Sequence, residues 1–336
     1  MTGKERILAM VAGKPVDHLP LMPITMMFAA DTIGVPYRRY ATDHRVLAEA
    51  QMAVAETFGF DYVSVISDPA REASDLGATI EWFENQPPAI VESTALLREK
   101  DRLRSLRLPA MEASPRMRDR VEGVALLAGK AGTSHMVEGW VEGPCAMAAD
   151  LRGLNTLMLD FYDDEAFVFD LFEFVVAMEI EFAREQVKAG ASLIGIGDAA
   201  ASLIGPRLYT NFVLPYEKKL VTAIRDMGVM VRLHICGNTK KILAGMGQTG
   251  AEIIDLDFLA SLAEGRAAMG ERQVLLGNID PVRALRDGTP ESVTAAFAEC
   301  HRQAGHRYIV GAGCEVTRGT PVENVKAMAQ FACSRN

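Results

Sequence analysis

The sequence predicts an α/β fold, a closed (β/α)8 TIM barrel of eight parallel strands and helices with an insertion between strands 2 and 3. The first observation is that short apolar runs alternate with longer stretches of helical periodicity, as repeated βα units do. The second is the length of 336 residues, which is usual for such a barrel with one insertion. We therefore expect a single domain over residues 1–336.

Eight apolar runs of strand length follow one another along the chain. Each has the length of a buried strand and is separated from the next by a helical pattern. They are residues 21–26, 61–67, 134–141, 192–198, 229–236, 252–258, 273–279 and 307–311. Eight such units favour a closed barrel over an open sheet.

The helices between these strands carry recognisable start and stop signals. A helix over residues 163–189 is followed by Gly190, and one over residues 210–227 is followed by Gly228, the residue type at which helices commonly end. Capping-box or proline start signals occur at Thr2 to Glu5, Thr289-Pro290 and Thr320-Pro321-Val322-Glu323.

One connection breaks this rhythm, because residues 69–133 are too many for a single crossover and contain several prolines. We expect this segment to be an insertion. Within it, a small hairpin is expected near residues 79–91, and the charged stretch at residues 98–107 is expected to face solvent.

Composition excludes several classes of protein. The net charge of −9 argues against nucleic-acid binding, which needs a basic surface. No apolar run reaches the roughly 18 residues of a membrane span, so no membrane association is expected. Five cysteines, an odd number spread along the chain, do not form a disulfide framework and favour a cytoplasmic location.

A His and two Cys form the most informative pattern. His234 and Cys236 are two residues apart at the end of the fifth expected strand, so their side chains point to the same face. Cys314 follows the eighth strand. Each alone is more simply a buried core residue, but together they would give Zn²⁺ three ligands and leave its fourth tetrahedral position open, as catalytic zinc sites do.

Other polar residues fall at strand ends, where TIM barrels carry their active sites. Asp198 and Asp257 are expected to orient the second nitrogen of the histidine or to hold a substrate group, although strand-end aspartates also cap helices. Asn278 is expected to donate to the substrate or to build a turn. Glu315, next to Cys314, is a candidate for an extra ligand or acid.

Several motifs resemble those of the uroporphyrinogen decarboxylase superfamily over nearly the whole chain. They include Leu214-Pro215-Tyr216, Gly277-Asn278-Ile279-Asp280-Pro281, His234-Ile235-Cys236 and Gly313-Cys314. The last two resemble the zinc signature of the corrinoid-dependent methyltransferase branch, typified by methylcobamide:coenzyme M methyltransferases. This resemblance implies a zinc enzyme that moves a methyl group between a corrinoid, such as methylcobalamin, and a small molecule, with a thiol such as coenzyme M as the favoured acceptor.

The chemistry agrees with that ligand set. A free thiol with a pKa near ~8.5 is mostly protonated at neutral pH, and a zinc ion with two cysteinate ligands lowers this pKa while the bound sulfur stays nucleophilic. The chain lacks the Asp-x-His-x-x-Gly pattern with which cobalamin-binding domains ligate cobalt, so the corrinoid is expected on a separate corrinoid protein.

Three alternatives remain open. The first is methyl transfer in the opposite direction, from a methyl ether or other donor to Co(I) corrinoid, as in an O-demethylase-type system. The second is a decarboxylase of tetrapyrrole synthesis, although the stretch at residues 26–36 lacks the arginines that such enzymes use to hold propionates. The third is a non-enzymatic barrel that stores or senses zinc.

Overall fold

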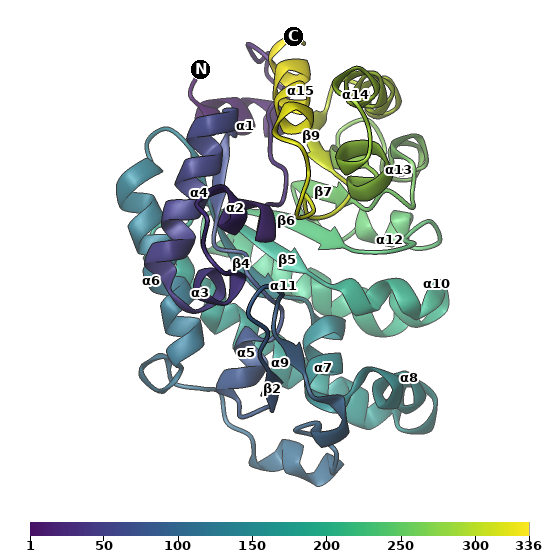
Figure 1. Cartoon of the computed structure of the whole chain (residues 1–336). Helices are drawn as coiled ribbons and strands as arrows, with labels where there is room; N and C mark the ends of the chain where they lie inside the picture. The colour runs from purple at the N-terminus through teal and green to yellow at the C-terminus, as the bar shows by residue number, and fades with distance from the viewer. Residues whose placement is uncertain (336) are drawn as a thin grey trace.

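The computed structural model describes residues 1–335 and is an α/β barrel, with helices arranged around a curled parallel sheet (Figure 1). The sheet has seven strands in the order β1-β4-β5-β6-β7-β8-β9, and all pairs are parallel. They are β1 (Tyr62–Ser64), β4 (Met136–Glu142), β5 (Leu193–Gly197), β6 (Met230–Ile235), β7 (Ile253–Leu256), β8 (Val274–Ile279) and β9 (Tyr308–Ala312). Seven of the eight expected strands are thereby confirmed.

The eighth position is filled by an irregular segment. Leu21 makes an isolated parallel bridge with Val310 of β9, and its carbonyl accepts a hydrogen bond of 3.0 Å from the residue just before β1. The segment thus closes the barrel. Pro20 and Pro23 have no N–H group, so a regular ladder cannot form here. The strand expected at residues 21–26 is therefore wrong as a regular strand, although its place in the barrel is correct.

The helices follow the expected order. The helix expected at residues 163–189 is confirmed as α9. The helix expected at residues 210–227 begins with a π turn, because Pro215 cannot donate the usual backbone hydrogen bond to the preceding turn. The helices are α1 (Gly3–Val11), α2 (Met27–Thr32), α3 (Tyr37–Thr42), α4 (His44–Phe58), α5 (Arg71–Asp75), α6 (Pro115–Ala131), α7 (Pro144–Arg152), α8 (Leu154–Asp163), α9 (Glu165–Lys188), α10 (Gly205–Leu208), the π turn η5 (Tyr209–Val213), α11 (Leu214–Asp226), α12 (Leu243–Met246), α13 (Leu262–Met269), the π turn η6 (Pro281–Arg286), α14 (Pro290–Ala304) and α15 (Val322–Cys333).

Two of the three expected helix starts are confirmed. The hydroxyl of Thr2 accepts from the N–H of Glu5, whose carboxylate accepts in return, and Thr289 caps α14 with a proline at its first position. The capping box expected at Thr320 is wrong. Its hydroxyl donates at 2.7 Å to the carbonyl of Thr317 instead, and α15 begins without a side-chain cap.

The long connection between β1 and β4 has two parts. Its first part holds α5, three short 3₁₀ turns and an antiparallel hairpin of β2 (Ile80–Glu81) and β3 (Ala89–Ile90), as expected. The charged stretch at residues 98–107 is largely exposed, also as expected. The last part is α6, which packs on α4 and β4 as the crossover helix of the barrel. The extra segment therefore ends before α6, earlier than the expected end at residue 133.

The interior of the barrel contains buried charges as well as apolar side chains. Arg232 on β6 donates to Asp255 on β7 at 2.6 Å and to Glu138 on β4 at 3.2 Å, and all three residues are buried. A guanidinium between two carboxylates compensates charges that would otherwise be costly to bury. This ion cluster adjoins the candidate site, because Arg232 lies two residues before His234 on β6 and Asp255 is paired in register with His234. None of the described helices has the length and apolarity that crossing a bilayer requires.

Candidate metal centre and active site

The three expected metal ligands meet at the C-terminal mouth of the barrel. His234 is near the end of β6, Cys236 directly follows that strand, and Cys314 follows β9. Their ligand atoms all lie within 4.8 Å of one another. Nε2 of His234 is 2.9 Å from Sγ of Cys236, which is 3.5 Å from Sγ of Cys314. The structure therefore brings together residues that are up to 80 positions apart.

Two glycines allow the sulfurs to approach each other. Gly237 turns the chain directly after Cys236 with a φ of +95°, a conformation that favours glycine. Gly313, just before Cys314, lies so close to the end of β7 that an added Cβ would be 2.4 Å from the backbone nitrogen of Phe258. Side chains at these positions would push the two cysteines away from the histidine.

Asp255 orients the histidine. Its Oδ2 lies 3.0 Å from Nδ1 of His234, and the two residues are paired in register between β6 and β7. Burial would raise the pKa of Asp255, but the charges of Arg232 and His234 hold it below its usual range. An ionised Asp255 favours a hydrogen on Nδ1, which leaves Nε2, the nitrogen that faces the sulfurs, as the one that can bind a metal ion. The orienting role was expected of Asp198 or Asp257, and Asp255 lies two residues before Asp257 on the same face of the strand.

The two cysteines are coupled by a hydrogen bond between their sulfurs, which are 3.5 Å apart. This hydrogen bond lowers the pKa of Cys314 to about 4 and raises that of Cys236. Burial would lower the pKa of His234, but the charges of Cys236 and Asp255 raise it well above the usual value. The cluster thus favours a deprotonated sulfur, the form in which cysteine binds metal ions.

The donor set fits a zinc ion. Typical Zn–S and Zn–N lengths of about 2.3 and 2.0–2.1 Å place tetrahedral ligand atoms roughly 3.6–3.8 Å apart. The observed 2.9 and 3.5 Å are slightly shorter, and small rotations of the side chains would open them to these values. Three protein ligands beside a cavity leave the fourth position accessible, as in catalytic rather than structural zinc sites.

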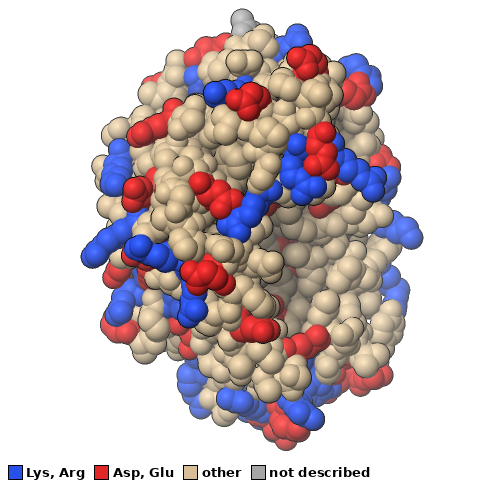
Figure 2. All heavy atoms as spheres, in the orientation of Figure 1, with Lys and Arg blue, Asp and Glu red and all other residues tan. Residues whose placement is uncertain are grey.

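A cavity of about 630 Å³ lies beside the three ligands, and all three line it. Its walls combine the apolar side chains of Ile24, Met26, Ile66 and Trp140 with the carboxyl groups of Asp68, Glu142 and Glu315. Through shared residues it continues into an open groove of about 1290 Å³ between α7 and the hairpin. Figure 2 shows this region as a hollow in the middle of the face. A small molecule can therefore reach the fourth position from solvent.

Asp198 follows β5 and is fully buried. Its backbone N–H donates to the carbonyl of His234 at 3.0 Å, but its carboxylate is directed to α7 and not to the imidazole. It caps α7, accepting from the N–H of Ala146 at 2.6 Å and from that of Cys145 at 3.4 Å. Burial raises its pKa to about 7, an effect that these two hydrogen bonds partly offset. The contacts are those of a helix cap, and a direct role for Asp198 in catalysis stays a prediction.

Asp257 and Asn278 fix the loop that follows β7. The Asp257 carboxylate accepts from the N–H of Gly237 and from that of Leu259, both at 2.9 Å. The Asn278 side chain donates to the carbonyls of Asp257 and Ala260, at 3.1 and 2.5 Å. Neither side chain is among the described residues that line the two cavities. Both residues act on the loops around the ligands, and contact with a substrate stays a prediction.

Two glutamates do line the cavity. Oε1 of Glu315 accepts from the N–H of Met27 at 2.6 Å, and burial raises the pKa of this carboxyl to about 7. Glu142 accepts from the indole N–H of Trp140 at 3.2 Å. Burial and the charges of nearby acids raise its pKa well above the usual value. Glu142 was missed as a site residue, although its position at the end of a strand indicated it.

Comparison with known proteins agrees with this geometry. Residues 2–334 match the family described as uroporphyrinogen decarboxylase (URO-D). The methylcobamide:CoM methyltransferase MtbA of Methanosarcina mazei is 31% identical over 342 residues, covering 100% of this chain and 98% of that protein. A methylated-thiol–coenzyme M methyltransferase of the same organism is 29% identical, over 99% and 89% of the two chains. A solved methyltransferase structure from M. mazei has a TM-score of 0.90 and 24% identity, over 99% and 98%, and shows the same fold.

Proposed function

Because the chain belongs to the uroporphyrinogen decarboxylase family, we propose that it is a zinc-dependent methyltransferase of that family, which moves a methyl group from a methylcorrinoid to a thiol. The observation that carries this proposal is the cluster of His234, Cys236 and Cys314 beside an open cavity. Relatives along the whole chain whose names describe methyl transfer from methylcobamide to CoM support it.

In this proposal the protein prepares the ligands for the metal. Asp255 holds the hydrogen on Nδ1 of His234, so that Nε2 is free to coordinate. Cys236 and Cys314 supply two thiolates. A zinc ion bound there would lower the pKa of an incoming thiol and, since two cysteinates already balance its charge, leave the thiolate electron-rich.

The transfer itself is a displacement at carbon. The substrate thiol would lose its proton to solvent, and the thiolate would attack the methyl carbon. The carbon–cobalt bond would break with both electrons going to cobalt, so that the products are a thioether and Co(I) corrinoid. The walls formed by Ile24, Ile66 and Trp140 exclude water from the sulfur, which strengthens its interactions with the site.

The corrinoid is proposed to arrive on a separate protein. The groove of about 1290 Å³ adjoins the ligands at Cys236 and opens to solvent between α7 and the hairpin, so a corrinoid carried by a partner has a route to the thiolate. Asp198, Asp257 and Asn278 are proposed as positioning residues, because they fix the turns that shape this mouth.

The direct test follows the cobalt spectrum. Protein reconstituted with zinc is incubated with methylcobalamin or a methylated corrinoid protein, with and without small thiols. Loss of the methyl–cobalt absorbance and formation of the methyl thioether only when a thiol is present is the expected result. If Co(I) corrinoid instead gained a methyl group from an ether while every thiol stayed inert, transfer would run in the opposite direction and the proposal would be wrong.

A further inference from the structure

We infer that the thiol accepted by this site carries no fixed negative charge, and that its remaining functional group is uncharged or an amine rather than a sulfonate or carboxylate. The inference rests on the proposed function and specifies its substrate class. It comes from the charges and hydrogen-bond donors around the cavity, and three separate observations support it.

First, the described residues that line the cavity and the adjoining groove include no lysine and no arginine. Apart from the three ligands, their ionisable side chains are all carboxyl groups: Asp68, Glu92, Glu142, Asp150 and Glu315. A sulfonate that enters the cavity loses its water and finds no cation to replace it, which is strongly unfavourable for a buried charge.

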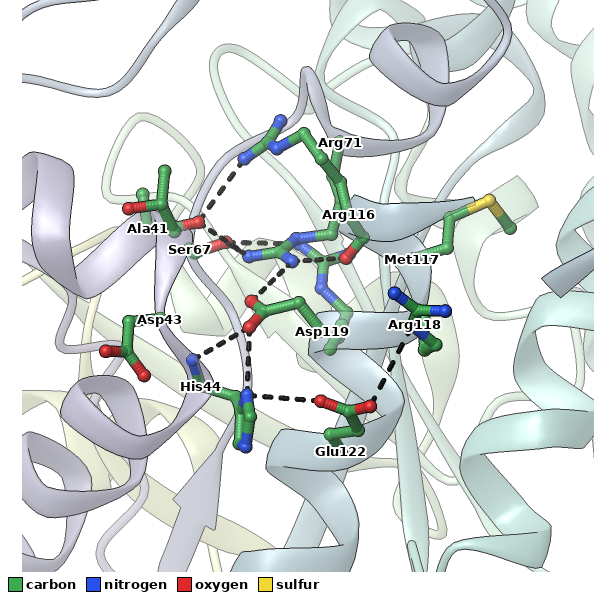
Figure 3. Close-up of polar contacts among 12 residues, drawn as sticks. Ala41, Asp43, His44, Ser67, Arg71, Arg116, Met117, Arg118, Asp119 and Glu122 are labelled. Atoms are coloured by element: carbon green, nitrogen blue, oxygen red, sulfur yellow. Dashed lines mark hydrogen bonds and ion pairs between the residues drawn. The ribbon is translucent and has the colours of Figure 1, made fainter. Parts of the chain in front are cut away.

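Second, two arginines that contact residues of the cavity wall, Arg116 and Arg71, are already paired. Arg116 donates to both oxygens of Asp68, at 3.0 and 2.9 Å, from behind the wall. Arg71 donates to Asp119 at 3.0 Å and to the hydroxyl of Ser67 at 3.0 Å, within the cluster drawn in Figure 3. Their guanidinium groups are therefore directed to the chain's own carboxylates rather than into the cavity.

The arginine at the rim is engaged in the same way. Arg318 donates to both oxygens of Asp31 at 2.7 Å, and to a backbone carbonyl of the hairpin connection at 2.6 Å. This fork pairs the charge of Arg318 and directs its guanidinium to Asp31. It is not available to a small molecule at the ligands.

Third, three groups of backbone N–H donors near the ligands are occupied by the chain's own carboxylates. Helix N-termini commonly bind anions, but the first amides of α7 donate to Asp198, and the N–H of Met27 donates to Glu315. The N–H of Gly237, next to the ligands, donates to Asp257. The chain's own carboxyl groups thus occupy these amides, which a substrate anion would otherwise use.

An uncharged or amine-bearing group suits the same walls. The carboxyl group of Glu142 faces the cavity beside the indole of Trp140. As a neutral acid it can hydrogen-bond to a hydroxyl, and on ionisation it pairs with an ammonium group, which the indole face also attracts.

The test compares three thiols that share the HS–CH₂–CH₂ frame: 2-mercaptoethanesulfonate (coenzyme M), 2-mercaptoethanol and cysteamine. With zinc-loaded protein and methylcobalamin, we expect kcat/KM for the sulfonate to be lower than for the other two by about tenfold or more, the usual size of a like-charge penalty. Isothermal titration calorimetry with the three S-methyl products is expected to give the same order of affinities. These products have no S–H group, so differences in thiol acidity do not affect this measurement.

A charge-introducing variant provides the matched control. Met26, half-buried in the cavity wall, is replaced by lysine (Met26→Lys), and Met26→Gln controls for the lost methionine. We expect only the lysine variant to increase kcat/KM for coenzyme M, relative to kcat/KM for 2-mercaptoethanol, by about tenfold. The affinity for the S-methyl product of coenzyme M should increase by a similar factor.

The outcomes separate the two proposals. Coenzyme M as the best acceptor of the unaltered protein, with its S-methyl product bound most tightly, would overturn the charge inference and leave thiol methylation intact. No methyl transfer to any of the three thiols by protein that holds zinc would overturn both.

Discussion

Asp255 and His234 are paired opposite each other in adjacent strands, and their side chains meet at 3.0 Å between Oδ2 and Nδ1. Asp255 is in turn held by Arg232, which is fully buried in the barrel. The orientation of the imidazole is therefore set by the barrel core rather than by a mobile loop. A rigid supporting residue of this kind keeps a metal ligand in place when substrates exchange at the open position.

The first prediction concerns metal content. Purified protein is expected to bind close to one zinc per chain, and Cys236→Ala and Cys314→Ser are expected to lose it, since each removes one of only three ligands. Metal analysis of dialysed protein provides the measurement, and circular dichroism checks the fold. Cys333→Ser, at an exposed cysteine on α15, is the matched control and should keep its zinc. Full zinc in both ligand variants would contradict the assignment.

The second prediction concerns Asp255. Asp255→Asn removes the carboxylate that orients His234, and we expect zinc affinity to fall by roughly 10–100-fold, measured by competition with a chelator. Because Asp255 also pairs with Arg232, Glu138→Gln serves as the control. It removes the other partner of the same arginine without touching the histidine. An equal loss of affinity in both variants would mean that the ion cluster, rather than the contact with His234, matters.

The third prediction separates the two roles of Asp198. Asp198→Ala removes the cap of α7, and we expect it to lower the free energy of unfolding by about 1–2 kcal/mol. Zinc stoichiometry should not change, because the Asp198 carboxylate does not contact the ligands and its backbone hydrogen bond to His234 remains in the alanine variant. Denaturant unfolding and metal analysis of the same preparation test this. Loss of zinc from a variant that remains folded would instead support a direct role at the metal.

The fourth prediction concerns the pH dependence of stability. Glu179 on α9 is fully buried and neither carboxyl oxygen has a hydrogen-bond partner. Burial, and then the charges of Glu72 and Glu142, raise its pKa well above the usual value. Above the unfolded-state pKa of about 4.3, the folded state therefore holds a proton that the unfolded state has lost, so stability falls as pH rises.

Glu179→Gln removes this linkage. We expect the variant to have a higher melting temperature than the unaltered protein, with a larger increase at pH 8 than at pH 5. Thermal unfolding at the two pH values measures the difference. Glu181→Gln, at an exposed glutamate of the same helix, is the control and should show no such dependence. If the variant and the unaltered protein differed in melting temperature by the same amount at pH 5 and at pH 8, Glu179 would not be protonated in the folded state.

The sequence by itself determined the order of the elements and identified the three candidate metal ligands. Strand and helix periods depend on residues close together in the chain, so patterning alone located seven of the eight strands and α9. The placement of His234, Cys236 and Cys314 together followed from the barrel rule that strand ends share one mouth. Helix capping could also be predicted as an alternative role for Asp198 and Asp257, because aspartates at strand ends commonly cap the helix that follows.

The tertiary structure decided which side chains meet. Leu21 lies beside β9, but the prolines on either side prevent a regular strand there. The helix α6 is part of the barrel because it packs on α4 and β4. Asp255, rather than Asp198 or Asp257, orients His234, because strand register sets that contact. The charge of the cavity depends on pairs such as Arg116 with Asp68 that close across the fold. Local patterns do not encode such distant contacts, since their free energy depends on the distance and burial that only the folded chain defines.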